Sequence, residues 1–206
     1  MSLSPYPLQE AVARLRELVA ESGCEEGVVV IRRTPDALRC RYERGAVIQA
    51  EFGGRTATVC TQEPVQATTR ISFMFDAALD SPQKRSAALV ILNVVSAFFC
   101  LARKVHACPP ECREACLREL AGDLRGKRVH AAGSLPGLDG ATEITWVESA
   151  DDADVVLVHA ASLLRAEDLP ASGGPARELF LGPSASGVAA LTERPHWCPY
   201  GTQRGI

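Results

Sequence analysis

Asp154-Val155-Val156-Leu157-Val158-His159 is the most continuous strand-like apolar run in the second half of the chain. A strand without polar alternation is typical of a parallel sheet that is covered on both faces. Further strands are predicted at residues 127–132, 142–147 and 178–181, with short helices at 162–169 and 187–192. Strands that alternate with helices indicate right-handed crossovers, so we expect a Rossmann-like parallel sheet over residues 126–206.

The first half of the chain has a different pattern, in which one helix is followed by several short strands. Apolar residues recur at helical spacing within 8–22, and Gly23 follows as a natural stop. Strands are predicted at 28–31, 38–43, 46–52 and 55–61, and Gly53-Gly54 is typical of a hairpin turn. Leu38, Cys40 and Tyr42 would share one face of the strictly alternating second strand. We therefore expect a small antiparallel α+β half.

Helical segments connect the two halves. Residues 67–79 are expected to be helical at least from Ile71, and Ser81-Pro82 is typical of the start of a second helix. That helix, expected to reach about residue 103, is apolar nearly all round, which indicates a central buried position. A third helix is predicted at 109–124. The predicted fold class is α/β, with an α+β half at 1–106, a linking helix at 107–125 and the Rossmann-like half at 126–206.

Composition excludes several classes of protein. The 206 residues are 47% hydrophobic and 23% charged, as is usual for a folded globular chain. The net charge of −3 and the scattered basic residues argue against a nucleic-acid partner. The apolar stretch at 87–102 is shorter than the roughly 20 residues of a membrane span, and no signal peptide is visible. We expect a soluble, cytoplasmic protein with 8 reduced cysteines, for which a homo-oligomer is an open alternative.

Four segments between residues 80 and 192 carry a family resemblance. The helical segment Ser86-Ala-Ala-Leu-Val-Ile-Leu-Asn-Val-Val95 is similar to an A-x-x-N-A helix, and Gly126-Lys-Arg-Val-His-Ala-Ala-Gly-Ser-Leu-Pro-Gly-Leu138 to a G-K-x-V-x-x-V-G-x-F-P-G-L segment. Residues 153–158 with 162–164 are similar to A-D-V-V-I-I-T-G-T-T-L, and 179–184 to V-x-L-L-G-P-S. In this order, the four segments resemble a family named for heavy-metal chelation.

The resemblance implies more than the periodicity does. It implies a first half like the enolase N-terminal domain, a Rossmann-like second half, and a site at the junction between them. The cysteine run at 108–116 and the tail at 195–200 are not part of the family pattern.

The first candidate site is formed by loops at the carboxyl ends of the predicted parallel strands, where open α/β sheets bind ligands. Glycines there let the backbone approach a ligand closely, and Glu148 occupies the position of a ribose-binding acid. The predicted ligand-binding residues are Gly133, Pro136, Gly137, Glu148, His159, Ser162, Gly182, Pro183 and Ser184. The alternative is that the glycines only form turns, that Glu148 is a solvated acid and that His159 is structural.

The second candidate site is the run Cys108-Pro-Pro-Glu-Cys112-Arg-Glu-Ala-Cys116. Residues four apart share one face of a helix, so these thiolates could bind a soft metal ion or an iron–sulfur cluster. Cys198 or His106 would be a fourth ligand. The alternative is plain packing, because Cys112 and Cys116 share their stripe with Leu120 and Leu124.

Three functions follow from these patterns. The leading interpretation is a metal- or metallocofactor-handling binding protein with its site at the junction of the two halves, its partner being a small molecule or a metal. The second is an enzyme that uses a nucleotide-like or methyl-donor cofactor at the strand ends. The third is a protein-interaction subunit without a ligand. No catalytic triad or other reaction is indicated by the sequence.

Overall fold

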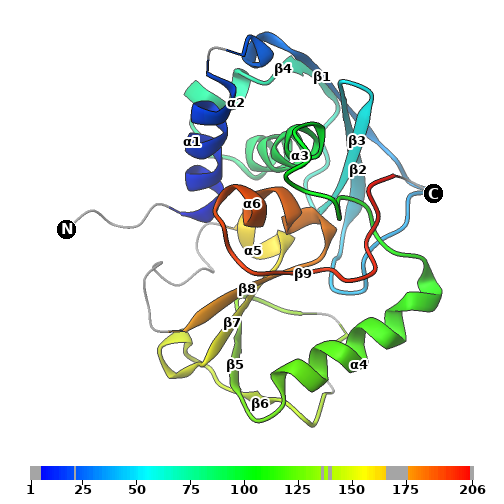
Figure 1. Ribbon diagram of the computed structural model, residues 1–206, viewed down its shortest axis with the longest axis vertical. Helices are drawn as coiled ribbons and strands as arrows, with labels where there is room; N and C mark the ends of the chain where they lie inside the picture. The colour runs from blue at the N-terminus through cyan, green and yellow to red at the C-terminus, as the bar shows by residue number, and fades with distance from the viewer. Residues whose placement is uncertain (1–5, 21, 136, 139–140, 166–175, 205–206) are drawn as a thin grey trace.

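The computed structural model describes residues 6–20, 22–135, 137–138, 141–165 and 176–204. They form two separate sheets, an antiparallel sheet of order β3-β2-β1-β4 and a parallel sheet of order β6-β5-β7-β8-β9 (Figure 1). The predicted α/β class, with an antiparallel half followed by a parallel one, is confirmed.

The antiparallel sheet consists of β1 (Val28–Arg33), β2 (Ala46–Phe52), β3 (Arg55–Thr61) and β4 (Ala67–Arg70). The predicted hairpin is present between β2 and β3. Both turn residues, Gly53 and Gly54, have positive φ values of 54° and 73°, which glycine adopts without steric cost.

Two expectations about this half are wrong. Residues 38–43 form an irregular loop with a turn at 41–42 rather than a strand, and residues 67–70 form β4 rather than part of a helix. The alternation at 38–43 does report burial, since Cys40 and Tyr42 are buried, but they pack against the second half of the chain. Strand β4 occupies the free edge of β1, where Thr69 pairs with Val29, and only the short helix α2 (Phe73–Asp76) follows it.

The helices of the first half cover one face of this sheet. Helix α1 (Pro7–Val19) lies on one side of α3 (Pro82–Phe98) and the antiparallel sheet on the other (Figure 1). Ser81 caps α3 by accepting the amide of Lys84, as its position before a proline predicts. Every residue from Ser86 to Ala97 is buried, so the central position of this helix is confirmed. Among the described helices, none is long and apolar enough to cross a membrane.

The parallel sheet consists of β5 (Arg128–Ala131), β6 (Thr145–Trp146), β7 (Val155–Val158), β8 (Arg177–Leu181) and β9 (His196–Trp197). Its helices are α4 (Arg113–Leu124), α5 (Ala160–Leu164) and α6 (Ser186–Leu191). Strand β6 is shorter than predicted, and β9 was not predicted because its two residues pair only through β8. Helix α4 begins at Arg113, after a 3₁₀ turn at Pro110–Cys112, so Cys108 and Cys112 both precede it and only Cys116 of the run lies within it.

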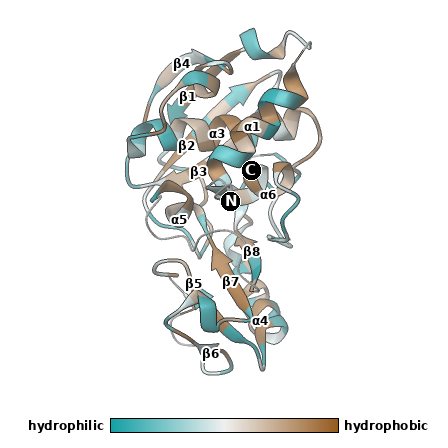
Figure 2. Ribbon diagram, turned by 90° about the vertical axis from the view of Figure 1, so that its left-hand side faces the viewer, coloured by the Kyte–Doolittle hydropathy of each residue, from teal (hydrophilic) through white to brown (hydrophobic). Residues whose placement is uncertain are grey.

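Figure 2 shows β7 in the hydrophobic colour, and this apolar run is explained by two cores, one on each face of the parallel sheet. Val156 and Val158 pack into a core around α3, α5 and α6, whereas Val155 and Leu157 pack into a second core with α4. Both cores draw residues from both halves of the chain. The halves are therefore joined by continuous packing rather than by a linker.

Candidate functional site

A groove lies where the two halves meet. It consists of two adjoining hollows of about 180 Å³ each, which share Arg44, Gln62, Ala161 and Arg165. The first is also lined by Tyr42, Gly133, Ser134, His159 and Ser162, and the second by Cys60, Thr61, Glu63, Pro82 and Leu164. We call these residues together the junctional groove.

Three of the residues predicted from sequence line this groove, namely Gly133, His159 and Ser162. They come together because β5 and β7 are neighbouring parallel strands, and each residue follows its strand at the carboxyl end. Gly133 has a φ of +86°, so a side chain there would be strained. His159 precedes α5, and the Ser162 hydroxyl donates to the His159 carbonyl (2.9 Å) and accepts its amide (3.0 Å).

The other predicted residues are elsewhere. Gly137 is not among the residues that line the groove, and its carbonyl accepts a hydrogen bond from Arg41 (3.5 Å). Glu148 is exposed and is not among the residues that line the junctional groove, so nothing in its position favours a ribose contact. Pro136 lies outside the described residues.

The turn Gly182-Pro183-Ser184 is a buried structural element next to the groove. The side chain of Asn93 donates to the carbonyls of Pro183 (3.3 Å) and Ser184 (2.9 Å) and accepts the amide of Gly187 (2.6 Å). The Ser184 hydroxyl in turn accepts the amide of Cys60 (3.0 Å). This turn therefore fixes the position of β3 relative to the parallel sheet.

Charge in the junctional groove is predominantly positive. Arg44 and Arg165 line both hollows, and Glu63 is the acidic residue that lines the second. Gln62 and Ser134 add neutral hydrogen-bonding groups. Guanidinium groups bind carboxylates and phosphates through paired hydrogen bonds, so this lining is suited to a small anionic molecule.

Glu43 is a buried acid that sequence reasoning missed. It lies between two groove-lining residues, Tyr42 and Arg44, and only 3% of its surface is exposed. Its Oε1 accepts the amide of Ser184 (3.1 Å). Burial raises the pKa of Glu43, although hydrogen bonds from Ser184 and Cys60 oppose this effect. The signal available in the sequence was weak, because Glu43 ended a stretch that was expected to be a strand.

Thiols surround Glu43. Its carboxyl lies close enough to raise the pKa of Cys40, Cys60 and Cys198, in addition to the larger effect of burial on each of them. For Cys198 the pKa rises to about 12. These thiols therefore stay protonated near neutral pH unless a cation stabilises the thiolate.

The predicted metal ligands are partly brought together. Cys108 and Cys116 are buried, Cys112 and Cys198 are half-buried, and the Cys116 sulfur lies 3.6 Å from the Tyr42 hydroxyl. Cys108 and Cys116 both contribute to the raised pKa of Cys198, so the run and the tail lie near each other. Nevertheless, across the described ranges no three His, Cys, Asp or Glu side chains are placed to hold a metal ion. Cys116 also packs with Leu120 and Leu124, as the packing alternative expected.

Comparisons with models of protein families, with curated proteins and with solved structures give no match for this chain. The resemblance to the heavy-metal chelation family therefore stays a prediction, and the case for function depends on the site itself.

Proposed function

We propose that this chain is a binding protein that holds a small anionic ligand, with a carboxylate-chelated metal ion as the leading class, in the junctional groove. The observation that carries the proposal is that Arg44, Arg165 and Cys60 line adjoining hollows. The guanidinium groups would bind the carboxylates, and the thiol is a ligand that soft metals prefer. This keeps the metal-handling interpretation and moves its centre from the cysteine run to the groove.

The size of the groove favours a small ligand over a dinucleotide. The two adjoining hollows measure about 180 Å³ each, so the whole groove is near the lower end of the about 300–1,000 Å³ that is usual for pockets of drug-sized ligands. Glu148 is not placed for a ribose contact, and the helix after the Gly133 loop that would bind a pyrophosphate is absent from the described residues. The enzyme with a nucleotide-like or methyl-donor cofactor is therefore the less supported alternative.

Calorimetric titration with citrate, zinc citrate and Zn²⁺ alone tests the proposal. Arg44→Gln and Arg165→Gln should each weaken citrate binding about tenfold or more, the usual effect of removing a charge-assisted hydrogen bond. Arg118→Gln, an exposed arginine on α4, is the matched control and should leave binding unchanged. Cys60→Ser should weaken zinc citrate more than citrate.

Two results would overturn this proposal. One is the absence of saturable binding for citrate and for zinc citrate. The other is tight binding of NAD or S-adenosylmethionine that does not respond to Arg44→Gln, which would favour the cofactor-using enzyme.

A second candidate is a soft-metal site formed by Cys108, Cys112, Cys116 and Cys198. One observation favours this site, namely that the thiols lie near one another. Cys112 and Cys116 contribute to the raised pKa of Cys108, and Cys108 and Cys116 contribute to that of Cys198. Occupancy would require side-chain rotation, because the described residues present no ready site. The positive charge of a bound metal would stabilise the thiolates that form when these thiols lose their protons.

A further inference from the structure

A second pocket lies on the antiparallel half, far in sequence from the Gly133 and His159 loops. It has a volume of about 200 Å³ and is lined by Thr34, Asp36, Ala37, Leu38, Gln49, Thr58, His106 and Ala107. None of these residues lines the junctional groove. This volume is several times the roughly 30 Å³ that one water occupies in the liquid, so the pocket has room for a molecule of about the size of a sugar ring.

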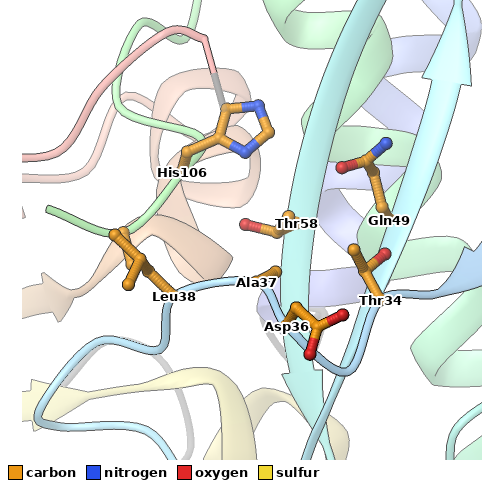
Figure 3. A pocket seen from close by; sticks show the side chains of 8 residues that line it. Thr34, Asp36, Ala37, Leu38, Gln49, Thr58 and His106 are labelled. Atoms are coloured by element: carbon orange, nitrogen blue, oxygen red, sulfur yellow. The ribbon is translucent and has the colours of Figure 1, made fainter. Parts of the chain in front are cut away.

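The sheet supplies the floor of this pocket. Gln49 of β2 and Thr58 of β3 are directly paired across the hairpin, which places their side chains on the same face. The loop that carries Ala37 and Leu38 and the segment that carries His106 flank them (Figure 3). The buried segment at 105–107 is held by hydrogen bonds from the Thr58 amide (3.0 Å) and hydroxyl (3.2 Å) to the Val105 carbonyl.

The lining offers several neutral polar groups that no other part of the described chain uses. The side chains of Thr34 and Gln49 make no hydrogen bond with another described residue. His106 uses its Nε2 on Thr56, at 2.9 Å from the carbonyl and 3.1 Å from the hydroxyl, so its Nδ1 remains as an acceptor. Burial lowers the pKa of His106, which keeps the imidazole neutral near pH 7.

Charge is confined to the edge of the pocket. Asp36 is the one charged residue in the lining, and Figure 3 shows its carboxylate directed away from His106. Apart from Asp36, the polar groups of the lining are neutral, which favours an uncharged molecule over an anion.

We propose that this pocket is a second ligand site, which takes a small neutral polyhydroxylated molecule of about the size of a monosaccharide. The amide of Gln49 could donate to one hydroxyl and accept from its neighbour, and His106 Nδ1 and the threonine oxygens could accept further hydroxyl protons. Leu38, Ala37 and Ala107 add apolar side chains to the lining, which would contact the C–H groups of such a ring. The site is independent of the proposed function of the junctional groove.

Amide NMR titration of the full chain with glucose, galactose and ribose tests this inference. Ethylammonium and acetate serve as a small cation and a small anion for comparison. Saturable shifts are expected at the amides of Ala37, Gln49, Thr58 and Ala107 for at least one sugar. Gln49→Leu and the smaller change Thr34→Val should each weaken binding about three- to tenfold, the loss expected for one neutral hydrogen bond. Gln66→Leu, which replaces an exposed glutamine at the other edge of the sheet, is the control.

The inference is overturned if no sugar gives saturable shifts, or if Gln49→Leu and Thr34→Val bind as the Gln66→Leu control does. It is also overturned if ethylammonium or acetate saturates these amides while the sugars do not. Citrate binding at the junctional groove, which involves other residues, would be unaffected by either result.

Discussion

The two cores of this protein differ in the kind of group that they bury. The core around α3 consists mainly of aliphatic side chains together with Phe180 and Met74, and the buried amide of Asn93 beside it is hydrogen-bonded through both its nitrogen and its oxygen. The core with α4 contains Tyr42, Cys40 and Cys116, and it borders the buried acid Glu43. Burial raises the pKa of Glu43, Tyr42, Cys40 and Cys198.

The two cores therefore contribute different properties: the core around α3 contributes mainly to stability, and the core with α4 holds the groups whose ionisation can change. Apolar burial around α3 and the satisfied amide of Asn93 lower the free energy of the folded state at any ordinary pH. The core with α4 buries acids in their protonated form, and their conversion to anions requires a nearby cation or a high pH. We expect substitutions in the first core to change the free energy of unfolding, and those around Glu43 to change its dependence on pH.

The largest effect is expected in the reactivity of Cys198. With a pKa of about 12 instead of 9.0, its thiolate population near pH 8 is about a thousandfold lower than that of an ordinary thiol. Iodoacetamide labelling read by mass spectrometry should therefore modify the exposed Cys100 long before Cys198. Urea-unfolded protein, in which both should react alike, is the control.

The same labelling tests the second candidate function. Anaerobic protein loaded with Zn²⁺ should show further protection of Cys108, Cys112, Cys116 and Cys198, and Cys112→Ser with Cys116→Ser should lose both metal and protection. Equal labelling with and without Zn²⁺ would contradict this candidate and indicate that these cysteines only pack. Rapid labelling of native Cys198 would contradict the contrast between the two cores.

The next largest effect is expected for Asn93→Ala. The substitution leaves the Gly187 amide and two carbonyls of the 183–184 turn without their buried partner, which should lower the free energy of unfolding by about 3 kcal/mol. Ser96→Ala on the same helix is the matched control, because the buried Ser96 hydroxyl makes no hydrogen bond within the described chain. Equal losses for both variants in urea unfolding would contradict the prediction, because they would show that the effect of Asn93→Ala does not come from its hydrogen bonds.

The smallest effect is expected for Glu43→Gln, and it depends on pH. Because the folded-state pKa of Glu43 is raised, the folded protein binds more protons than the unfolded chain above the ordinary pKa of 4.5. Its stabilising contribution is complete below that value and falls as pH rises toward the folded pKa. Glutamine mimics the protonated acid and removes this loss.

Urea unfolding at pH 5 and pH 8 should therefore show that Glu43→Gln gains stability relative to wild type as pH rises, by on the order of 1 kcal/mol. Glu111→Gln, at an exposed glutamate before α4, should show no such gain. A gain that is the same at both pH values would indicate that Glu43 is ionised in the folded protein.

Local sequence patterns identified the elements that depend on neighbouring residues. The Gly53-Gly54 hairpin, the Ser81 cap, the all-round apolar helix α3 and the unbroken run of β7 were all evident before the structure. The positions of Gly133, His159 and Ser162 at strand ends were also sufficient to place them at one site. These features follow from periodicity, from backbone conformations and from the rule that parallel strands end at the same edge.

Other features were decided only by tertiary structure. The alternation at 38–43 showed that Cys40 and Tyr42 are buried, but not that they pack against α4 instead of a sheet partner. Residues 67–70 become β4 because the edge of β1 is open to them. Arg44 and Arg165, which are 121 positions apart in the sequence, line the same groove, and Glu43 is buried against the Ser184 turn. A short-range pattern reports which side chains are buried, whereas their partners depend on how distant segments pack, and those contacts set the charge and the pKa values of the site.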